Sequence, residues 1–183
     1  MIQLLYNLYI KLKYKKKMKS IDNINKLNKP DFLTIFGNVF EKTDWIAEKV
    51  FELKPFIDFN DFSSKMIDLY ENCNKENVLL ILNSHPELAV AKKLTSESML
   101  EQAGAKLNEC NHEESEEFKK LNLDYKNKFG FPFIVSVKGK NKNEILNNFR
   151  QRILNDIQDE FEEAKIQVKK IAIIRLNQIF ENN

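Results

Sequence analysis

The pair His85-Pro86 is the first place in this sequence where acid–base chemistry is expected. Histidine titrates near neutral pH, so its ring can take up and release a proton under ordinary conditions. Pro86 suits the first position of a helix, which predicts that His85 caps a helix start. The positive end of that helix would disfavour the imidazolium and keep His85 ready to accept a proton. Taken alone, the pair more often indicates a plain capping or surface histidine.

Ser98 and Glu101 form a second candidate, in the segment that begins at Thr95. Thr95 is a good helix cap, so Ser98 and Glu101, which are three residues apart, share one helix face. A hydroxyl beside a carboxylate can hold a polar ligand that donates and accepts hydrogen bonds. The same spacing also fits a capping box, in which the two side chains only secure a helix start.

The segment Phe129-Gly130-Phe131-Pro132-Phe133-Ile134 offers backbone groups rather than side chains. A residue before proline is pushed to an extended conformation, and Pro132 has no amide hydrogen. The amides and carbonyls of Phe133 and Ile134 are therefore predicted to lie outside any helix and to be free to form hydrogen bonds with another group. The phenylalanines would form an apolar wall beside them, and a simple plug of the core is the alternative.

Arg175 is a fourth candidate, because only Arg150, Arg152 and Arg175 among the 29 basic residues are arginines. It continues the apolar stripe of the last predicted helix, which consists of Ile153, Ile157, Phe161, Ala164, Val168 and Ile171 and resumes at Ile179. An unpaired guanidinium on a buried face is costly, so Arg175 should have an anionic partner. The sequence leaves a protein carboxylate and a bound anion equally open.

Helical periodicity dominates the elements that must position these groups. The first predicted helix has Asp31 as its cap and continues to Phe40. Further helices are predicted from Thr43 or Asp44 to Val50, from Asp58 to Tyr70, from Asn74 to Leu82, from Asn111 to Tyr125, and from Lys142 to Phe180 with a break near Asn155. The run from Val78 to Leu82 is apolar all round and should be buried. Only Phe133 to Val137 reads as extended. The prediction is an all-α, single-domain helical bundle with one short extended segment near 131–138.

Length, charge and cysteine content narrow the class of protein. The chain has 183 residues, of which 43% are hydrophobic, and this is enough for one core. Residues 1–20 contain six lysines and no acidic residue, and the remaining 23 basic and 27 acidic residues give a net charge of −4. That body lacks the basic face that nucleic acids require. Cys73 and Cys110 show neither metal-site nor disulfide spacing, so we expect no metal and a reduced, cytoplasmic protein.

Residues 1–19 are expected to be a lysine-rich extension of a domain that spans residues 20–183. The apolar run at its start is too short to cross a bilayer, which takes about 20 residues, so no membrane partner is expected. The chain closes on Glu181-Asn182-Asn183 rather than on a peroxisomal targeting tripeptide. We therefore expect a cytoplasmic location, with the peroxisome left open for a eukaryotic source.

Five ordered segments together resemble the family of 2-oxo-4-hydroxy-4-carboxy-5-ureidoimidazoline (OHCU) decarboxylases. They are Phe36-Gly37-Asn38-Val39-Phe40-Glu41-Lys42-Thr43-Asp44-Trp45-Ile46-Ala47-Glu48, His85-Pro86-Glu87-Leu88-Ala89, Leu94-Thr95-x-x-Ser98-x-x-Glu101-Gln102-Ala103-Gly104, Leu121-Asn122-x-x-Tyr125-x-x-Lys128-Phe129-Gly130-Phe131-Pro132-Phe133, and Arg175-Leu176. The resemblance covers about Leu27 to Phe180, and the common order of the segments makes it specific. The chain departs from the family at Glu87, where Asp is common, and at Val90 and Lys106, where Gly is frequent.

The resemblance implies an all-helical, homodimeric enzyme that needs no metal or organic cofactor. Its reaction would be the conversion of OHCU to (S)-allantoin and carbon dioxide in urate breakdown. The implied catalytic residues are His85, Glu101 and Arg175. The implied substrate-binding residues are Pro86, Ser98, Phe133 and Ile134, the last two through their backbone, and again Arg175. Two other classes stay open: a homologue that binds the ligand without turnover, and a helical protein-interaction module, which would not need these residues together.

Overall fold

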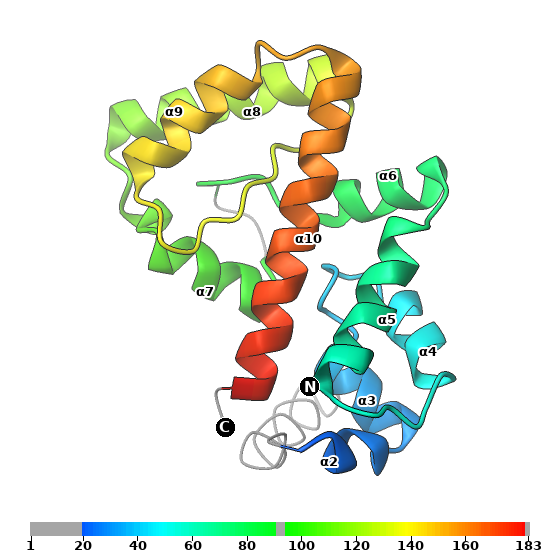
Figure 1. Cartoon of the computed structure of the whole chain (residues 1–183). Helices are drawn as coiled ribbons and strands as arrows, with labels where there is room; N and C mark the ends of the chain where they lie inside the picture. Colours follow the sequence, from blue (N-terminus) through cyan, green and yellow to red (C-terminus); the bar gives the residue numbers. More distant parts are fainter. Residues whose placement is uncertain (1–19, 91–93, 182–183) are drawn as a thin grey trace. The chain divides into compact units, whose positions relative to one another are not determined.

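The structure is a computed structural model, and it describes residues 20–90 and 94–181 (Figure 1). The predictions for residues 1–19 fall outside these ranges. The helices are α2 Ile21–Asn25, α3 Lys29–Phe36, α4 Trp45–Phe51, α5 Phe59–Glu71, α6 Lys75–Ser84, α7 Ser96–Gly104, α8 His112–Phe129, α9 Lys142–Arg152 and α10 Ile157–Glu181, with a 3-10 helix at Leu107–Glu109. No described residue lies in a β-strand, which agrees with the all-α prediction. None of the described helices is long and apolar enough to cross a membrane.

Internal packing divides the chain into two compact units. The described part of the first unit is residues 20–78 together with 169–181, and that of the second is residues 79–90 and 94–168. Helices α6 and α10 therefore each contribute residues to both units.

Short polar side chains set the helix starts in the first unit. The Asn28 side chain accepts a hydrogen bond from the Asp31 backbone N–H at 2.9 Å, and α3 begins at Lys29. The prediction that Asp31 caps this helix is therefore wrong, because Asn28 takes that role and Pro30 fits the first turn. Asp58, where the next helix was predicted to begin, caps α5 by accepting a hydrogen bond from the backbone N–H three residues later at 2.7 Å.

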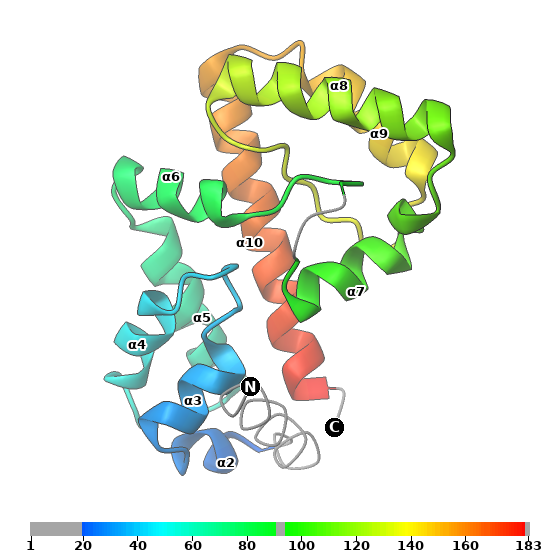
Figure 2. The ribbon, with the colours of Figure 1, turned by 180° about the vertical axis from the view of Figure 1, so that it is seen from behind.

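Phenylalanine rings form the core of the first unit. The buried rings of Phe32, Phe36 and Phe62 have centroids 4.8 to 6.0 Å apart, within the range of favourable ring contacts. Helix α3 ends at Phe36, so Val39 and Phe40 are buried from the turn after the helix and not from the longer helix that was predicted. Helix α4 packs against both α3 and α5 (Figure 1 and Figure 2).

Capping boxes start two helices of the second unit. The Asn111 side chain accepts from the Glu114 N–H, and the Glu114 carboxylate accepts from the Asn111 N–H, both at 2.8 Å. Asn141 forms the same arrangement at the start of α9. Helix α8 continues beyond its predicted end to Phe129 and stops at Gly130, whose φ of 79° suits a residue without Cβ.

Residues 131–137 form a non-helical segment in the core of the second unit. Every residue of this segment is buried. The Phe133 ring stacks on Phe149 at 3.8 Å, and the Tyr125 ring meets Phe133 edge-on at 5.3 Å. The Ser136 N–H donates to Oε1 of Gln167 at 2.9 Å, so side chains replace the missing strand partner. The predicted ordered, non-helical segment is therefore confirmed.

Two apolar positions are exposed, contrary to the prediction. Leu80 in α6 is 62% exposed, so the run 78–82 is not buried on all sides. Ile157 is 64% exposed and Ile153 lies before α10, so the buried stripe of α10 begins at Phe161. The predicted break near Asn155 is confirmed by the non-helical residues 153–156 between α9 and α10.

Candidate active site

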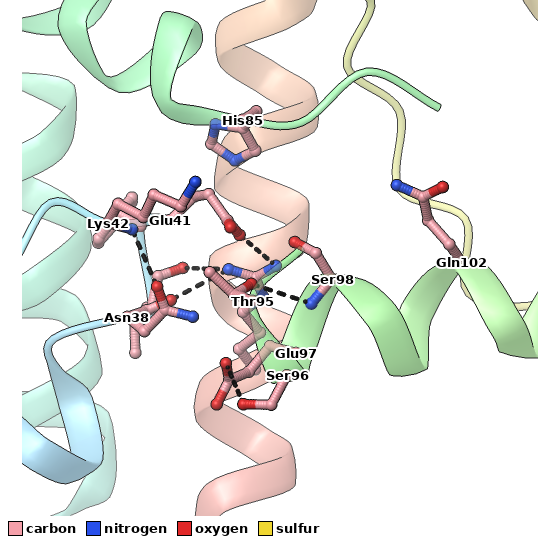
Figure 3. Close-up of polar contacts among 12 residues, drawn as sticks. Asn38, Glu41, Lys42, His85, Thr95, Ser96, Glu97, Ser98 and Gln102 are labelled. Carbon is pink, nitrogen blue, oxygen red and sulfur yellow. Dashed lines mark hydrogen bonds and ion pairs between the residues drawn. The ribbon is translucent and has the colours of Figure 1, made fainter. Parts of the chain in front are cut away.

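His85 follows the last turn of α6 and does not precede a helix (Figure 3). Helix α6 ends at Ser84, and residues 85–90 are turns or irregular backbone. The prediction that His85 caps a helix start is wrong, because Pro86 marks the end of a helix that it cannot continue. The carbonyl end of a helix favours a cation, so the predicted dipole argument for a neutral ring does not hold.

The helix that precedes His85 also orients its ring. Nδ1 lies 2.9 Å from the Ile81 carbonyl oxygen, and the residue is only 8% exposed. A carbonyl only accepts hydrogen bonds, so Nδ1 must donate and carry the hydrogen. Nε2 is then the nitrogen through which neutral His85 takes up a proton. A ring held in one tautomer and one orientation is what a general base requires.

Two side-chain amides hold the turn that follows the histidine. Gln102 Nε2 donates to the Glu87 carbonyl at 3.3 Å, and Gln102 Oε1 accepts from the Ala89 N–H at 3.1 Å. Asn122 Nδ2 donates to the Leu88 carbonyl at 2.9 Å. Sequence reasoning assigned neither amide a role, because nothing local in the sequence indicates a contact between separate elements.

Ser98 and Glu101 lie within one turn of each other in α7, as predicted. The Thr95 side chain accepts from the Ser98 N–H at 3.3 Å and caps the helix (Figure 3). The alternative, a capping box made by Ser98 and Glu101, is wrong because α7 already begins at Ser96. Ser98 is buried and Glu101 is partly buried. Their hydroxyl and carboxylate therefore share one face of a helix whose start is secured by another residue.

The backbone of Phe133 and Ile134 is available only in part. The Ile134 carbonyl accepts from Arg152 Nη1 at 2.8 Å, which corrects the prediction that this carbonyl is open to a ligand. Among the described residues, neither the Phe133 nor the Ile134 amide donates a hydrogen bond to a protein group. The two amides are thus available for hydrogen bonding, as predicted, whereas the Ile134 carbonyl is not.

A buried ion pair, absent from the sequence-based predictions, holds that carbonyl in place. Arg152 Nε donates to Glu160 Oε1 at 3.0 Å, and the Tyr125 hydroxyl donates to the same carboxylate. Burial raises the pKa of the Tyr125 hydroxyl, and its hydrogen bond to Glu160 raises it further. Tyr125 therefore remains a donor at neutral pH. Arg152 received no role from the sequence, because its partner lies on the next helix and reaches it only through the bend at 153–156.

Arg175 forms the buried ion pair of the first unit. Its Nη2 lies 3.0 Å from Glu41 Oε2, and its Nη1 donates to the Asn38 carbonyl at 3.0 Å. Glu41 and Lys42 both have positive φ, and the Lys42 N–H donates to Asn38 Oδ1 at 2.9 Å (Figure 3). The predicted need for an anionic partner is confirmed, and of the two options left open the structure provides the protein carboxylate.

The candidate residues fall into both units. The second unit contains His85, Pro86, Ser98, Glu101, Phe133 and Ile134, and the first contains Arg175. Within the second unit, Gln102 joins the helix of Ser98 and Glu101 to the turn after His85. Across residues 20–90 and 94–181, no group of three or more His, Cys, Asp or Glu side chains is arranged to hold a metal ion.

Known proteins resemble this chain over most of its length. The family model described as OHCU decarboxylase matches residues 25–177, a range that includes every candidate residue. A uric acid degradation bifunctional protein from Bacillus sp. strain TB-90 is 37% identical over 169 residues, which are 91% of this chain and 34% of that protein. The chain therefore spans about a third of that relative. A 2-oxo-4-hydroxy-4-carboxy-5-ureidoimidazoline decarboxylase from Haloferax volcanii is 31% identical over 163 residues, which are 89% of this chain and 97% of that protein.

A solved structure shares the fold. The crystal structure of an OHCU decarboxylase in the presence of (S)-allantoin matches with a TM-score of 0.66 and 23% identity, over 79% of this chain and 96% of that chain. This likeness confirms the predicted helical fold. From the match of the family model and the near full-length match to the Haloferax protein, it follows that this chain belongs to the OHCU decarboxylase family.

Proposed function

We propose that this protein converts OHCU to (S)-allantoin, with release of carbon dioxide, as a step of urate degradation. The observation that carries the proposal is the family match over residues 25–177, which includes all seven candidate residues. The names of the two relatives add support, because one denotes uric acid degradation and the other denotes the decarboxylase.

The reaction calls for orientation and proton transfer. The bond between the ring carbon and its carboxylate breaks, carbon dioxide leaves, and the electron pair is delocalised into the adjoining unsaturated ring. The hydroxyl on this carbon loses its proton and becomes the ring carbonyl of allantoin. A proton adds from one face to the neighbouring ring carbon, which bears the ureido group, and this sets the (S) configuration. The substrate itself accepts the electron pair, so the protein has to hold the substrate, stabilise charge and deliver the proton.

His85 is proposed to handle the protons. With Nδ1 bonded to the Ile81 carbonyl, Nε2 takes the proton of the substrate hydroxyl and returns a proton later in the reaction. The carbonyl end of α6 stabilises the imidazolium formed between these two steps. The corrected position of His85, after a helix, therefore supports this role better than the predicted position before one.

Groups of the second unit are proposed to hold the ring and ureido parts of the substrate. Ser98 offers a hydroxyl and Glu101 a carboxylate, while Phe133 and Ile134 offer two amide donors beside buried apolar side chains. Pro86 adds an apolar contact next to the histidine. Such a mixture of donors, acceptors and apolar surface fits a small heterocycle with a urea substituent.

Arg175 is proposed to engage the anionic oxygens of the substrate. A guanidinium can engage two oxygens at once through its planar fork. Its ion pair with Glu41 and its bond to the Asn38 carbonyl hold the fork in one orientation. Fixing the guanidinium in advance lowers the entropy that must be lost when the substrate binds.

We further infer a cytoplasmic homodimer. The family resemblance supports the dimer, and the exposed Met99 and Leu100 on α7 are apolar groups of the kind that interfaces cover. Cys73 and Cys110 are free thiols, which supports a reducing compartment. Light scattering at micromolar concentration tests the assembly, and the mass of a single chain would contradict it.

The direct test is to add the purified chain to freshly generated OHCU and to follow optical activity. OHCU also decays without enzyme to racemic allantoin, so loss of substrate alone is not informative. We expect (S)-allantoin to appear at a rate proportional to protein concentration. A racemic product formed at the uncatalysed rate would contradict the proposal, and binding of the ligand under the same conditions would identify an inactive homologue.

A further inference from the structure

Side-chain amides from two helices hold the turn Glu87-Leu88-Ala89, here called the 87–89 turn. Gln102 of α7 donates to the Glu87 carbonyl at 3.3 Å and accepts from the Ala89 N–H at 3.1 Å. Asn122 of α8 donates to the Leu88 carbonyl at 2.9 Å. Three consecutive residues outside any helix thus each have a backbone group bonded to an amide from another element.

The turn has a backbone conformation that needs such support. Ala89 has a φ of 54°, which lies in the left-handed region that is disfavoured for residues with a Cβ. A conformation of this kind persists where surrounding contacts impose it, and such residues gather at functional sites. The bond from the Ala89 N–H to Gln102 therefore selects this shape of the turn.

Both side-chain amides are buried, and the burial of Asn122 lowers the stability of the fold. Gln102 is 7% exposed and Asn122 is 3% exposed. Within the described residues, the buried Oδ1 of Asn122 accepts no hydrogen bond, which disfavours the folded state. A leucine of similar size would avoid that cost. A buried polar atom without a hydrogen bond is expected where the residue serves function as well as packing.

Only one residue separates the 87–89 turn from His85. Pro86 is that residue, and its fixed φ leaves little freedom between the two. On its other side, the ring of His85 is anchored to a carbonyl of α6. Gln102 directly follows Glu101 on α7, so one side chain links the helix of the proposed substrate-binding groups to the backbone that carries the proposed base.

We propose that Gln102 and Asn122 are positioning residues that hold the 87–89 turn and thereby keep His85 aligned for proton transfer. The proposal rests on the proposed acid–base role of His85. A misplacement of about 1 Å costs on the order of a hundredfold in rate. A loosened turn should therefore lower kcat and leave KM nearly unchanged, because other groups hold the substrate.

The variant Gln102→Glu tests this with little change in shape. An ionised carboxylate still accepts from Ala89 but directs a negative oxygen at the Glu87 carbonyl, whereas a protonated carboxyl can donate to it. At pH 8 we expect kcat about ten- to hundredfold below wild type, with KM within about threefold. The ratio of variant to wild-type kcat should rise as the pH falls toward about 5, where the carboxyl gains its proton. A merely structural role would not produce this recovery.

Asn25 provides a matched control in the first unit. Its Nδ2 donates to the Phe56 carbonyl and its Oδ1 accepts from the Phe56 N–H, both at 2.8 Å. Asn25→Asp thus removes the same donor from the same kind of two-bond contact, and it should lower thermal stability while kcat per folded molecule stays at the wild-type value. Asn122→Leu is a second test variant, which removes the bond to Leu88 together with the buried oxygen and should lower kcat about tenfold.

The two histidines of the chain give a readout that does not depend on turnover. In Gln102→Glu at pH 8, the NMR signals of the His85 ring nitrogens should shift or broaden relative to wild type at the same pH, and those of the exposed His112 should not. If the wild-type protein forms no (S)-allantoin, the proposed function fails and the His85 signals alone decide the positioning role. Wild-type His85 signals in both Gln102→Glu and Asn122→Leu, or a loss of kcat no larger than that of Asn25→Asp, would overturn the proposal.

Discussion

Each unit of this protein contains a buried arginine–glutamate pair, and the two pairs differ in what surrounds them. In both, the glutamate side chain is fully buried, and the side chains of Arg152 and Arg175 are only 7% and 3% exposed. The carboxylate of Glu160 also accepts from the Tyr125 hydroxyl, so Arg152 belongs to a network that includes a tyrosine of α8. Glu41 instead lies in a turn with a positive φ, where its carboxylate meets the guanidinium of Arg175.

The two pairs also differ in the number of residues that separate their partners in the sequence. Arg152 and Glu160 are eight residues apart and close the bend between α9 and α10, whereas Arg175 and Glu41 are 134 residues apart. A buried pair is weak support for net stabilisation, although removal of one partner is costly in either case. Burial alone therefore does not distinguish an arginine that maintains the fold from one that acts on a substrate. The distinction appears only when stability and activity are measured together.

Glu160→Ala should have the largest effect on stability. It leaves the buried guanidinium of Arg152 without its counter-charge and removes the acceptor of the Tyr125 hydroxyl. We expect the free energy of unfolding to fall by about 3–5 kcal/mol, measured by urea denaturation. Glu117→Ala is the control, because it removes the partner of the exposed Arg150 and should cost at most about 1 kcal/mol. Equal losses in the two variants would contradict the structural role of the buried pair.

Arg175→Lys should reduce activity far more than stability. Lysine keeps a positive charge beside Glu41 but lacks the planar fork that engages two oxygens. We expect kcat/KM to fall roughly a hundredfold or more, the scale seen when a charge-stabilising donor is lost. Arg152→Lys should instead reduce thermal stability more than activity. Wild-type kinetics in Arg175→Lys would show that Arg175 is only a structural ion-pair partner.

Tyr125→Phe should destabilise the protein less than Glu160→Ala, by about 1–3 kcal/mol at pH 7, because it removes only one donor from Glu160. Burial and the bond to Glu160 raise the pKa of the Tyr125 hydroxyl in the folded state. Stability from a raised pKa is complete below the unfolded-state value near 10 and is lost as the pH rises above it. The free energy of unfolding of wild type should therefore fall more steeply above about pH 10 than that of the variant, and equal slopes would refute this.

The helices were largely predictable, because periodicity and caps are local properties. Asp58, Thr95 and Asn111 each cap the helix predicted for them, since one side chain and a backbone N–H nearby decide where a helix begins. Asp31 failed as a cap because Asn28 competes for the same role within one turn. Lys106 has a φ of 57°, which explains why glycine is frequent at this position in the resembled family.

His85 shows where a local pattern allows two structures. Proline occurs both in the first turn of a helix and just after the end of one. The first alternative is the one predicted from the sequence, whereas in the structure the apolar run before His85 forms the helix. The identity of the candidate base was predictable, but the direction of the helix dipole that acts on it was not.

The contacts that hold the site were the least predictable part. Gln102 and Asn122 reach backbone groups that are 13 to 34 residues away in the sequence. The pairing of Arg152 with Glu160 depends on the bend at 153–156. Such contacts follow from how helices pack, and helical periodicity determines only which face of each helix is buried.

The proposed proton transfer by His85 is tested most directly by the rate at which His85→Asn forms (S)-allantoin, followed by optical activity with freshly generated OHCU. The asparagine keeps a polar side chain that can donate to the Ile81 carbonyl but cannot transfer a proton near pH 7. His112→Asn is the matched control, because His112 is the other histidine of the chain and is exposed. With both variants as stable as wild type, we expect a loss of roughly a hundredfold or more in His85→Asn and no loss in His112→Asn. An undiminished initial rate in His85→Asn would show that His85 does not transfer the proton.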